Sequence, residues 1–385
     1  MSAADILCLN CGSSSLKLSR FAVGETGEAL LHEGVVEGIG LESGRMELRD
    51  VEGRTLVGVD AVFHEHGQAL HGLLDSLHGH GLDAVEAVGH RVLHGGPHRQ
   101  GPARIDTSLL EELRARAPQA PLHLPQELAV IAAVTTRWPG FAQVACFDTA
   151  FHRRMPELAQ RDPLPRALFD AGLRRYGYHG LSYESVLHTL GEDAEGRVII
   201  AHLGHGSSLA AVKDGTPIDT TMGLTPSGGV MMSTRSGDLD PGVVLALLER
   251  FGGDLVRVAE LLSQDSGLLG VSGSSADMRR LLELRHTDPH ADQAVRMFCR
   301  SVRKAIGALA TELAGLDLLV FTGGIGEHAP AVRSEICRGL AHLGVPVGAE
   351  GASRSLPGAA VRVVPTHENR VIARQTWDLL FAEPG

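Results

Sequence analysis

The chain has 385 residues, of which 43% are hydrophobic and only 4% aromatic, and a formal net charge of −11. This length exceeds what one ordinary hydrophobic core serves, so two globular domains are predicted. The acidic balance without a long Lys/Arg run argues against a nucleic-acid partner, and no uncharged apolar stretch is long enough for a membrane span.

The N-terminus has no basic region before its first apolar run, and the five cysteines are scattered along the chain. These features predict a cytoplasmic protein with reduced thiols. The histidines are numerous, but none shows HExxH spacing. Those in the polar, glycine-rich region are predicted to lie on the solvated surface: His64, His66, His71, His78 and His80.

The first predicted domain comprises residues 1–150 together with 366–385. It begins with a buried strand over residues 5–9 and a return strand over 17–22. Alternation and apolar periodicity then predict short strands over 35–54, a helix over 61–77, a strand over 85–93, a helix over 126–138 and a strand over 143–147. A terminal helix over 368–380 is expected to return to this domain.

The second predicted domain comprises residues 151–365. Its first strand covers 198–202 and is followed by a return strand over 209–213 and a turn at Asp214-Gly215. Further on, the pattern predicts helices over 243–251 and 291–314, a buried strand over 316–322, a glycine loop over 323–327, a helix from residue 329 and a strand over 361–364.

Two distant segments repeat one pattern. Ile6-Leu7-Cys8-Leu9-Asn10-Cys11-Gly12-Ser13-Ser14 recurs as Ile200-Ala201-His202-Leu203-Gly204-His205-Gly206-Ser207-Ser208. Each segment is an apolar strand that enters a Gly-Ser turn, whose N–H groups and hydroxyls suit phosphate oxygens. The repeat predicts two related domains with a duplicated core. The order of the predicted elements in these domains is the layout of the α/β fold of the actin, Hsp70 and sugar-kinase type (ribonuclease H-like), in which a nucleotide binds in the cleft between the two domains.

Several charged residues stand where a buried core residue is expected. Arg91 lies within an apolar strand, Asp148 ends another, and Arg235 lies in a small polar loop. Burying a charge without a partner is costly, so either an Arg91–Asp148 ion pair or an anion site lined by guanidinium groups explains them. Walker A spacing is absent. Gly323-Gly324-x-Gly326 predicts a nucleotide contact or a plain turn.

Six motifs, in order along nearly the whole chain, resemble those of the acetate kinase family. They are Asn10-Cys11-Gly12-Ser13-Ser14-Ser15-Leu16-Lys17, Gly89-His90-Arg91-Val92-Leu93-His94-Gly95-Gly96, Phe147-Asp148-Thr149-Ala150-Phe151-His152, Tyr176-Gly177-Tyr178-His179-Gly180, Thr234-Arg235-Ser236-Gly237-Asp238 and Gly324-Ile325-Gly326-Glu327. The resemblance implies a homodimer that transfers a phosphoryl group reversibly between ATP and acetate, giving acetyl phosphate and ADP.

The resemblance also implies roles for individual residues. Asn10 and Glu368 match the family's metal-binding positions (Mg²⁺ or Mn²⁺). Lys17 matches the lysine that contacts the nucleotide phosphates, and Arg91 matches the arginine that binds the substrate. Asp148 matches a residue described as a proton donor or acceptor. His179 and Arg235 match the residues that stabilise the transition state, and His123 matches a further active-site histidine. The matched ATP-binding segments are His202, Leu203, Gly204, His205 and Gly206; Asp277, Met278 and Arg279; and Gly324, Ile325, Gly326, Glu327 and His328. The matched acyl pocket is Leu93, Leu122, Tyr178 and Pro226.

A carboxylate acceptor is already ionised at pH 7, so we expect Asp148 to position a metal or an arginine rather than to take a proton. The chain departs from the family pattern at His205 and His328, where Asn is usual. It departs again in Leu124-Pro125-Gln126-Glu127, where Asn, Pro and Asn are typical. Leu93 and Tyr178 replace the commoner Val and Phe, and the bulkier Leu93 predicts acetate over propionate.

Alternative functions stay open at the level of the sequence. A propionate kinase or another short-chain acyl kinase would differ only in its substrate. A polyol or sugar kinase of the same fold would use Asp148 as the base for a hydroxyl acceptor. An ATP-driven clamp of the actin or Hsp70 type would need no acceptor at all.

Overall fold

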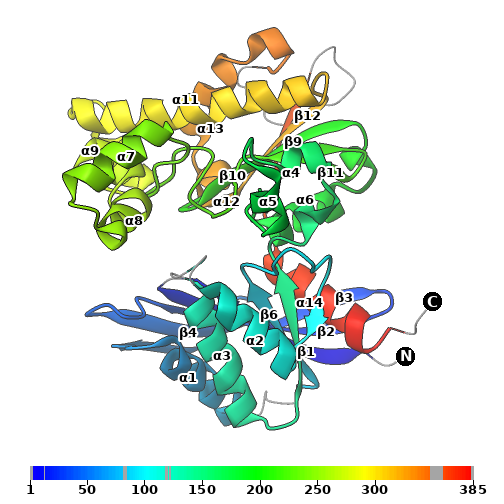
Figure 1. Cartoon of the computed structure of the whole chain (residues 1–385). Helices are drawn as coiled ribbons and strands as arrows, with labels where there is room; N and C mark the ends of the chain where they lie inside the picture. The colour runs from blue at the N-terminus through cyan, green and yellow to red at the C-terminus, as the bar shows by residue number, and fades with distance from the viewer. Residues whose placement is uncertain are drawn as a thin grey trace. The chain divides into compact units, whose positions relative to one another are not determined.

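The computed structural model describes residues 3–12, 14–80, 85–117, 120, 123–346 and 359–382. The chain forms two compact units, Met1–Phe151 with His367–Gly385, and His152–Thr366 (Figure 1). Among the described residues, no helix combines the length and the apolar character that a bilayer crossing requires.

The first unit is built on an eight-stranded sheet in the order β5-β4-β3-β2-β1-β6-β8-β7. The strands are β1 (Ala4–Cys11), β2 (Ser15–Gly24), β3 (Gly27–Glu37), β4 (Gly44–Asp50), β5 (Thr55–Ala61), β6 (Ala87–Val92), β7 (Ala103–Arg104) and β8 (Ala142–Phe147). The helices are α1 (His66–Gly79), α2 (Thr107–Arg116), α3 (Leu124–Arg137) and α14 (Glu368–Leu380).

Strand β1 is buried on both of its faces, and Asn10 near its end is a polar residue among apolar ones. Leu7, Leu9 and Cys11 belong to the hydrophobic cluster that α1 and α3 cover. Because successive side chains of a strand point to opposite faces, Asn10 projects to the other side, where it contacts Glu368 of α14. Helix α14 packs on β1, β2 and β6. The alternation of β1 therefore places its last polar residue against the first turn of α14.

The second unit is built on a five-stranded sheet in the order β11-β10-β9-β12-β13. The strands are β9 (Arg197–Leu203), β10 (Ser207–Lys213), β11 (Thr216–Thr220), β12 (Leu318–Thr322) and β13 (Ala360–Val363). The helices are α4 (Glu157–Gln160), α5 (Arg166–Asp170), α6 (Gly180–Leu190), α7 (Pro241–Arg250), α8 (Leu255–Gln264), α9 (Gly267–Ser272), α10 (Met278–Leu284), α11 (Pro289–Glu312), α12 (Gly323–His328) and α13 (Pro330–Arg338). Among the described residues, 3₁₀ turns cover Phe151–Arg154, where the first unit leads into the second, Gly191–Ala194 and Ala341–Leu343.

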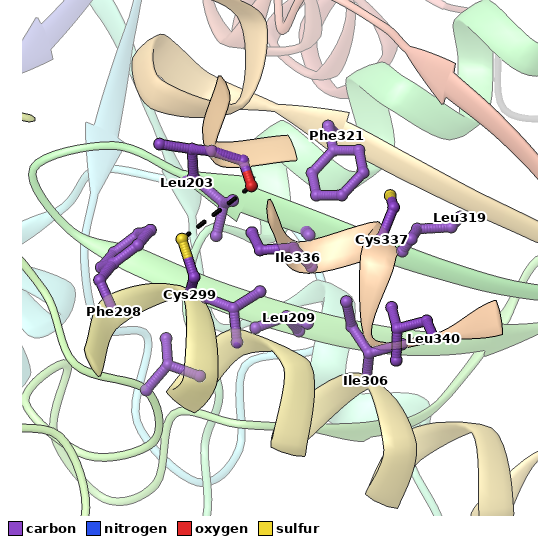
Figure 2. Close-up of a cluster of buried hydrophobic side chains, with 14 of the residues drawn as sticks. Leu203, Leu209, Phe298, Cys299, Ile306, Leu319, Phe321, Ile336, Cys337 and Leu340 are labelled. Atoms are coloured by element: carbon purple, nitrogen blue, oxygen red, sulfur yellow. Dashed lines mark hydrogen bonds between the residues drawn. The ribbon is translucent and has the colours of Figure 1, made fainter. Parts of the chain in front are cut away.

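Helix α11 forms the centre of the second core. It starts at Pro289 after the N-cap Asp288, whose carboxylate accepts a hydrogen bond from the His290 N–H. Its buried side chains recur at helical spacing, among them Phe298, Val302 and Ile306. Figure 2 shows this stripe beside apolar side chains of the sheet and of α13. The low aromatic content is thus compensated by tightly packed aliphatic residues.

The two sheets repeat one topology. In the first unit, β3, β2 and β1 pair antiparallel with one another, and β6 and β8 continue the sheet parallel to β1. In the second unit, β11, β10, β9, β12 and β13 reproduce this pattern in the same order. The duplicated core predicted from the two Gly-Ser segments is therefore confirmed, and so is the fold class.

Most predicted elements are observed with ends shifted by one or two residues, and two predictions differ more clearly. Residues 61–65 are not helical: β5 ends at Ala61 and α1 begins only at His66. Val62 and Phe63 resemble the start of an apolar helical face, but Val62 is exposed and Phe63 packs against Gly44 at the strand edge. Likewise, the predicted glycine loop over 323–327 is a helical turn, α12, because β12 leads directly into it.

Candidate active site

The first Gly-Ser hairpin carries two polar side chains at neighbouring positions. Asn10 on β1 pairs in register with Lys17 on β2, so both side chains project from the same face. Lys17 is exposed, and the turn is closed by a hydrogen bond from the Gly12 N–H to the Ser15 carbonyl at 2.8 Å. The hairpin therefore presents a lysine amine and an amide side chain together at one end of the sheet.

Arg91 and Asp148 form an ion pair at the ends of two adjacent parallel strands. Arg91 donates from Nε and Nη2 to Asp148 Oδ2, at 2.9 and 2.5 Å. Its Nη1 lies 3.4 Å from Asn10 Oδ1 and 3.5 Å from the Cys11 carbonyl oxygen. Both side chains are largely buried. The structural ion pair is thus present, and the same guanidinium also faces the first hairpin.

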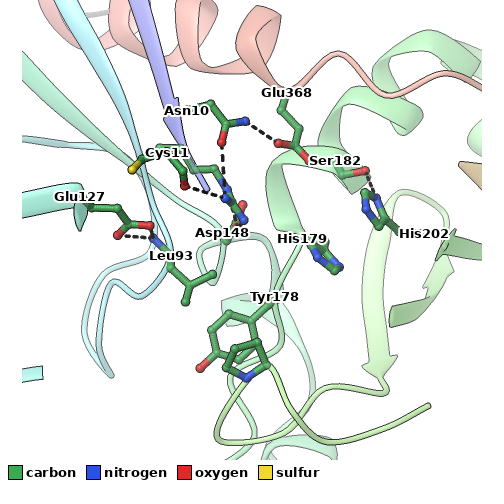
Figure 3. A network of polar contacts seen from close by, with 12 residues as sticks. Asn10, Cys11, Leu93, Glu127, Asp148, Tyr178, His179, Ser182, His202 and Glu368 are labelled. Carbon is green, nitrogen blue, oxygen red and sulfur yellow. Dashed lines mark hydrogen bonds and ion pairs between the residues drawn. The ribbon is translucent and has the colours of Figure 1, made fainter. Parts of the chain in front are cut away.

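The electrostatics of this cluster hold Arg91 firmly charged. Burial alone lowers the pKa of Arg91, but the carboxylates of Asp148 and Glu368 more than offset that effect and raise it above its ordinary value. Glu368 opens α14 and accepts a hydrogen bond from Asn10 Nδ2 at 2.8 Å (Figure 3). Residues far apart in sequence therefore meet around one permanent cation.

Leu93 follows β6 directly and is buried, with 2% of its surface exposed. Its backbone N–H donates to both carboxylate oxygens of Glu127, at 3.2 and 3.1 Å (Figure 3). Glu127 lies in the first turn of α3, and His123 is the residue that precedes this helix. Leu122, the other acyl-pocket residue predicted nearby, lies outside the described residues.

In the second unit, His179 and Arg235 converge on the second Gly-Ser hairpin. A Cβ added to Gly206 would lie 3.3 Å from Arg235 Nη1 and 3.4 Å from His179 Nε2, so both side chains pack beside this glycine. Arg235 also donates to the Pro226 carbonyl at 3.0 Å. The loop that carries Arg235 is attached to the hairpin, since the Ser233 N–H donates to the His205 carbonyl at 3.3 Å.

Two stacked imidazoles stand at this hairpin. The rings of His179 and His202 are 4.2 Å apart between centroids. The Nδ1 atom of His179 contacts Ser208 Oγ at 2.8 Å. The Nδ1 atom of His202 contacts Ser182 Oγ, also at 2.8 Å (Figure 3). His179 holds a left-handed backbone with φ of 59°, a conformation that costs a non-glycine residue free energy. The hydroxyl contacts at Nδ1 fix the orientation of both rings.

Tyr178 and Pro226, predicted to line an acyl pocket, are both buried. The Tyr178 hydroxyl donates to the Leu224 carbonyl at 2.7 Å, and its backbone carbonyl accepts from His152 Nε2 at 3.0 Å. Because its hydroxyl is already bonded, Tyr178 offers mainly an apolar ring face. Leu93, in contrast, belongs to the first unit.

The predicted nucleotide segments begin at the ends of β9 and β12. Gly323 packs against the Leu203 carbonyl, and Gly204 lies near the Gly324 N–H, so the hairpin and the start of α12 are in contact. Glu327 turns back to accept hydrogen bonds from the Gly323 N–H and from the Thr322 hydroxyl. His205 and His328 are exposed. Both departures from the usual Asn therefore lie at the surface.

The remaining predicted segment begins α10. Asp277 is the N-cap of this helix and pairs with Arg279 at 2.9 Å, while Met278 between them is buried in the core of the second unit. Both charged side chains are largely exposed. The capping of α10 is a sufficient structural reason for an aspartate at position 277. A nucleotide-binding role for this segment therefore stays a prediction.

Sequence reasoning missed the groups that orient the site. Glu127, Ser182 and Ser208 contact predicted site residues, but no local spacing joins them to their partners. His66 was predicted to be solvated; it is buried and its Nε2 donates to the Gly12 carbonyl at 2.9 Å. Its place at the start of α1, facing the first hairpin, explains the error. For Ser208, the sequence did contain a signal, because this residue belongs to the Ser-Ser pair that the two repeated segments share.

Two α/β units of one topology, each with a Gly-Ser hairpin beside cationic side chains, define a kinase of the actin, Hsp70 and sugar-kinase fold class. The chain belongs to the acetokinase family, whose model matches residues 5–374. The acetate kinase of Rhodopseudomonas palustris strain TIE-1 is 42% identical over 394 residues, which cover 97% of this chain and 98% of that protein.

Solved structures agree with this membership. The crystal structure of Porphyromonas gingivalis acetate kinase superposes with a TM-score of 0.84 at 35% identity, covering 98% of this chain and 100% of that one. The crystal structure of a propionate kinase from Francisella tularensis gives a TM-score of 0.87 at 33% identity, covering 97% and 98%. The fold and the family resemblance predicted from the motifs are thus confirmed.

Proposed function

We propose that the protein transfers the γ-phosphoryl group of ATP reversibly to acetate, giving acetyl phosphate and ADP. The observation that carries this proposal is the permanently charged Arg91 guanidinium, held by Asp148 at the end of β6 in a member of the acetokinase family. A guanidinium offers a forked pair of donors to a carboxylate, which suits an anionic acceptor.

Asp148 is proposed to orient Arg91 rather than to act as a base. One of its oxygens accepts both hydrogen bonds from the guanidinium. An ionised acceptor carboxylate attacks without losing a proton, so the reaction requires no general base. A polyol kinase would require Asp148 to accept a proton from a hydroxyl group, and this geometry favours the carboxylate acceptor instead.

In the second unit, Arg235, His179 and the Gly206 backbone are proposed to bind the moving phosphoryl group. Phosphoryl transfer spreads negative charge over the equatorial oxygens of a loose transition state, so catalysis depends on positioning and electrostatic stabilisation. The stacked His179 and His202 rings, each fixed by a serine, provide oriented donors. Lys17 of the first hairpin is proposed to contact the nucleotide phosphates.

Asn10 Oδ1 and the Glu368 carboxylate are oxygen ligands of the kind that suit a divalent ion such as Mg²⁺, and the two side chains are neighbours because Asn10 Nδ2 donates to Glu368 Oε2 at 2.8 Å. Among the described residues, no group of three His, Cys, Asp or Glu side chains forms a metal cage. Few protein ligands suit an ion that keeps waters and binds substrate phosphates. The ion would supply charge neutralisation of the nucleotide phosphates.

A homodimer is proposed from the family and from exposed apolar side chains of the second unit. Leu245 on α7 is 66% exposed, and Leu255 and Val256 on α8 are each 69% exposed. Exposed apolar residues grouped on neighbouring helices suit a surface that is buried by a second copy. Light scattering of the purified protein is expected to give twice the monomer mass, and Leu255→Glu is expected to lower it. A monomeric wild type would contradict the proposal.

The function is tested by trapping the product with hydroxylamine, which converts an acyl phosphate to a coloured hydroxamate. Acetate, propionate and butyrate are each supplied with ATP or with GTP. We expect the highest kcat/KM with acetate and ATP. A higher value with propionate would make this chain a propionate kinase, and ATP turnover independent of any acid would contradict the proposal altogether.

A further inference from the structure

Glu127 is a buried carboxyl group that the proposed reaction does not use. Only 2% of the residue is exposed, and both carboxylate oxygens contact the same backbone donor, the N–H of Leu93. Among the described residues, no Lys, Arg or His forms a salt bridge with it. One backbone N–H does not compensate a buried negative charge, because desolvation of a carboxylate is costly.

The position of Glu127 links it to the acceptor site. Its partner Leu93 follows β6 two residues after Arg91, and Glu127 itself lies one helical turn after His123. It belongs to the segment in which the chain departs from the family pattern. A side chain that holds the backbone between a substrate-binding arginine and an acyl-pocket residue influences both.

The charge of Glu127 matters because the surroundings are already negative. Asp148 and Glu368 face Arg91 from the end of β8 and from α14, so the cluster carries two carboxylates for one guanidinium. Cys11 on β1 also faces Glu127, and burial raises the pKa of that thiol so that it stays neutral. A third ionised carboxylate would oppose a further anion at Arg91.

We propose that Glu127 is a positioning residue: its carboxyl group holds the Leu93 backbone, and a negative charge on this group weakens binding of the acceptor carboxylate at Arg91. This inference rests on the proposed function. Desolvation is the main cause that raises the pKa of Glu127 to about 8, and the negative charge of Asp148 adds to this effect. The positive charge of Arg91 and the hydrogen bond from the Leu93 N–H lower the pKa and offset part of the rise. The group therefore changes charge in a range in which acetate itself is fully ionised.

The test measures KM for acetate, KM for ATP and kcat from pH 7 to pH 9, with ADP formation as the readout. A group that titrates with a pKa of about 8, and that must be protonated for acceptor binding, raises the apparent KM for acetate about tenfold by pH 9. We expect this rise in the wild type, with KM for ATP changing less than twofold. A wild-type KM for acetate that stays flat overturns the proposal without any variant.

Glu127→Gln keeps the shape and an acceptor for the Leu93 N–H but removes the charge, so we expect its KM for acetate to be nearly independent of pH. Glu127→Met is a second neutral variant, which lacks the acceptor; it should also give a flat profile. Glu112→Gln is the matched control, because Glu112 pairs with Arg99 on the surface of the same unit. This variant should reproduce the wild-type profile.

The outcomes separate this inference from the proposed function. Acetate-dependent turnover with the same pH profile in wild type, Glu127→Gln and Glu112→Gln would contradict the role of Glu127 and leave the proposed function intact. A wild type without acetate-dependent ADP formation at pH 7 would instead contradict the proposed function. A merely structural role of Glu127 predicts lower thermal stability of the variants with an unchanged pH dependence of KM.

Discussion

At the scale of single residues, the guanidinium of Arg235 is the clearest candidate for stabilising the transition state. Its anchor is a hydrogen bond to the Pro226 carbonyl, and it packs beside Gly206 at the second hairpin. Arg235→Ala is expected to lower kcat by about 10³-fold, the order seen when a charge-stabilising arginine is removed from a phosphoryl-transfer enzyme.

The control for this prediction is Arg235→Lys, which keeps the charge but loses the planar fork, and an intermediate kcat is expected. Steady-state kinetics with acetate and ATP check both variants, and circular dichroism confirms that each is folded. A kcat close to that of the wild type in Arg235→Ala would remove this residue from the catalytic site.

Leu93 is expected to set the preference among short acids. It is buried and its backbone is held by Glu127, so its side chain has little room to move. Leu93→Val removes one methylene and is expected to raise kcat/KM for propionate relative to acetate by about 10-fold or more, since one methylene is worth about 1–3 kcal/mol. Parallel assays with the two acids measure the ratio. An unchanged ratio would show that Leu93 does not contact the acyl chain.

At the scale of elements, the second hairpin depends on a glycine that makes space for two side chains. Gly206→Ala adds a Cβ at 3.3 Å from Arg235 Nη1 and 3.4 Å from His179 Nε2. Both contacts are with side-chain ends, which must shift by a few tenths of an ångström. Because a small misplacement of catalytic groups is costly, we expect kcat to fall about tenfold or more while the melting temperature changes little.

Gly307→Ala on α11 is the matched substitution for Gly206→Ala. A Cβ at Gly307 meets nothing within 4 Å, and alanine in a helix interior is favoured by roughly 0.5–1 kcal/mol over glycine. This variant should keep the wild-type kcat and melt slightly higher. Equal losses of kcat in both variants would show that the hairpin effect is not specific.

At the scale of the whole molecule, three buried histidines predict instability in acid. Burial lowers the pKa of His90, His94 and His152 to about 4 each. Between pH 6.5 and 4 the unfolded chain binds protons that the native state does not, so unfolding becomes easier as the pH falls through this window. Stability contributed by the neutral rings is fully present above pH 6.5.

Thermal melts at several pH values check this prediction, with His90→Gln as the informative variant. His90 contacts Gln143 Oε1 at 2.8 Å, a bond that a glutamine amide can also make. In the wild type, His90 contributes about one proton to the difference in proton binding between the unfolded and native states. Without it, the slope of the unfolding free energy against pH should be smaller by about 1.4 kcal/mol per pH unit in the variant. Parallel curves for variant and wild type would contradict the assignment.

The sequence predicted most strands and the residues at their ends, because both signals are local. Asn10, Arg91 and Asp148 each interrupt or end an apolar run, and the parallel strands then bring Arg91 and Asp148 together. The Ser182–His202 contact and the Leu93–Glu127 contact depend on how separate elements pack. No periodicity in a single chain reports such pairings, so these orienting groups were found only in the structure.

Element boundaries were harder to predict than element types. The apolar residues at 62 and 63 fit a helical pattern. However, the residues before them form strand β5, which ends at Ala61, and the helix starts only at His66. In contrast, α14 begins and ends where its amphipathic pattern does. The reason is that two structures compete for the same residues. Pairing of β5 with the sheet can override a weak helical pattern in the sequence.

Helix α14 carries a consequence for how the protein is made. It supplies Glu368 to Asn10, Asn369 to Ser19 and Arg374 to Glu28, so the two ends of the polypeptide complete one unit. During synthesis the ribosome must finish more than two hundred intervening residues, roughly ten seconds or longer at the pace of translation, before this helix emerges. Until then, the face of β1 and β6 around Gly89 lacks Ile372 and Thr376, the side chains that pack against it, so the N-terminal sheet cannot bury this face co-translationally.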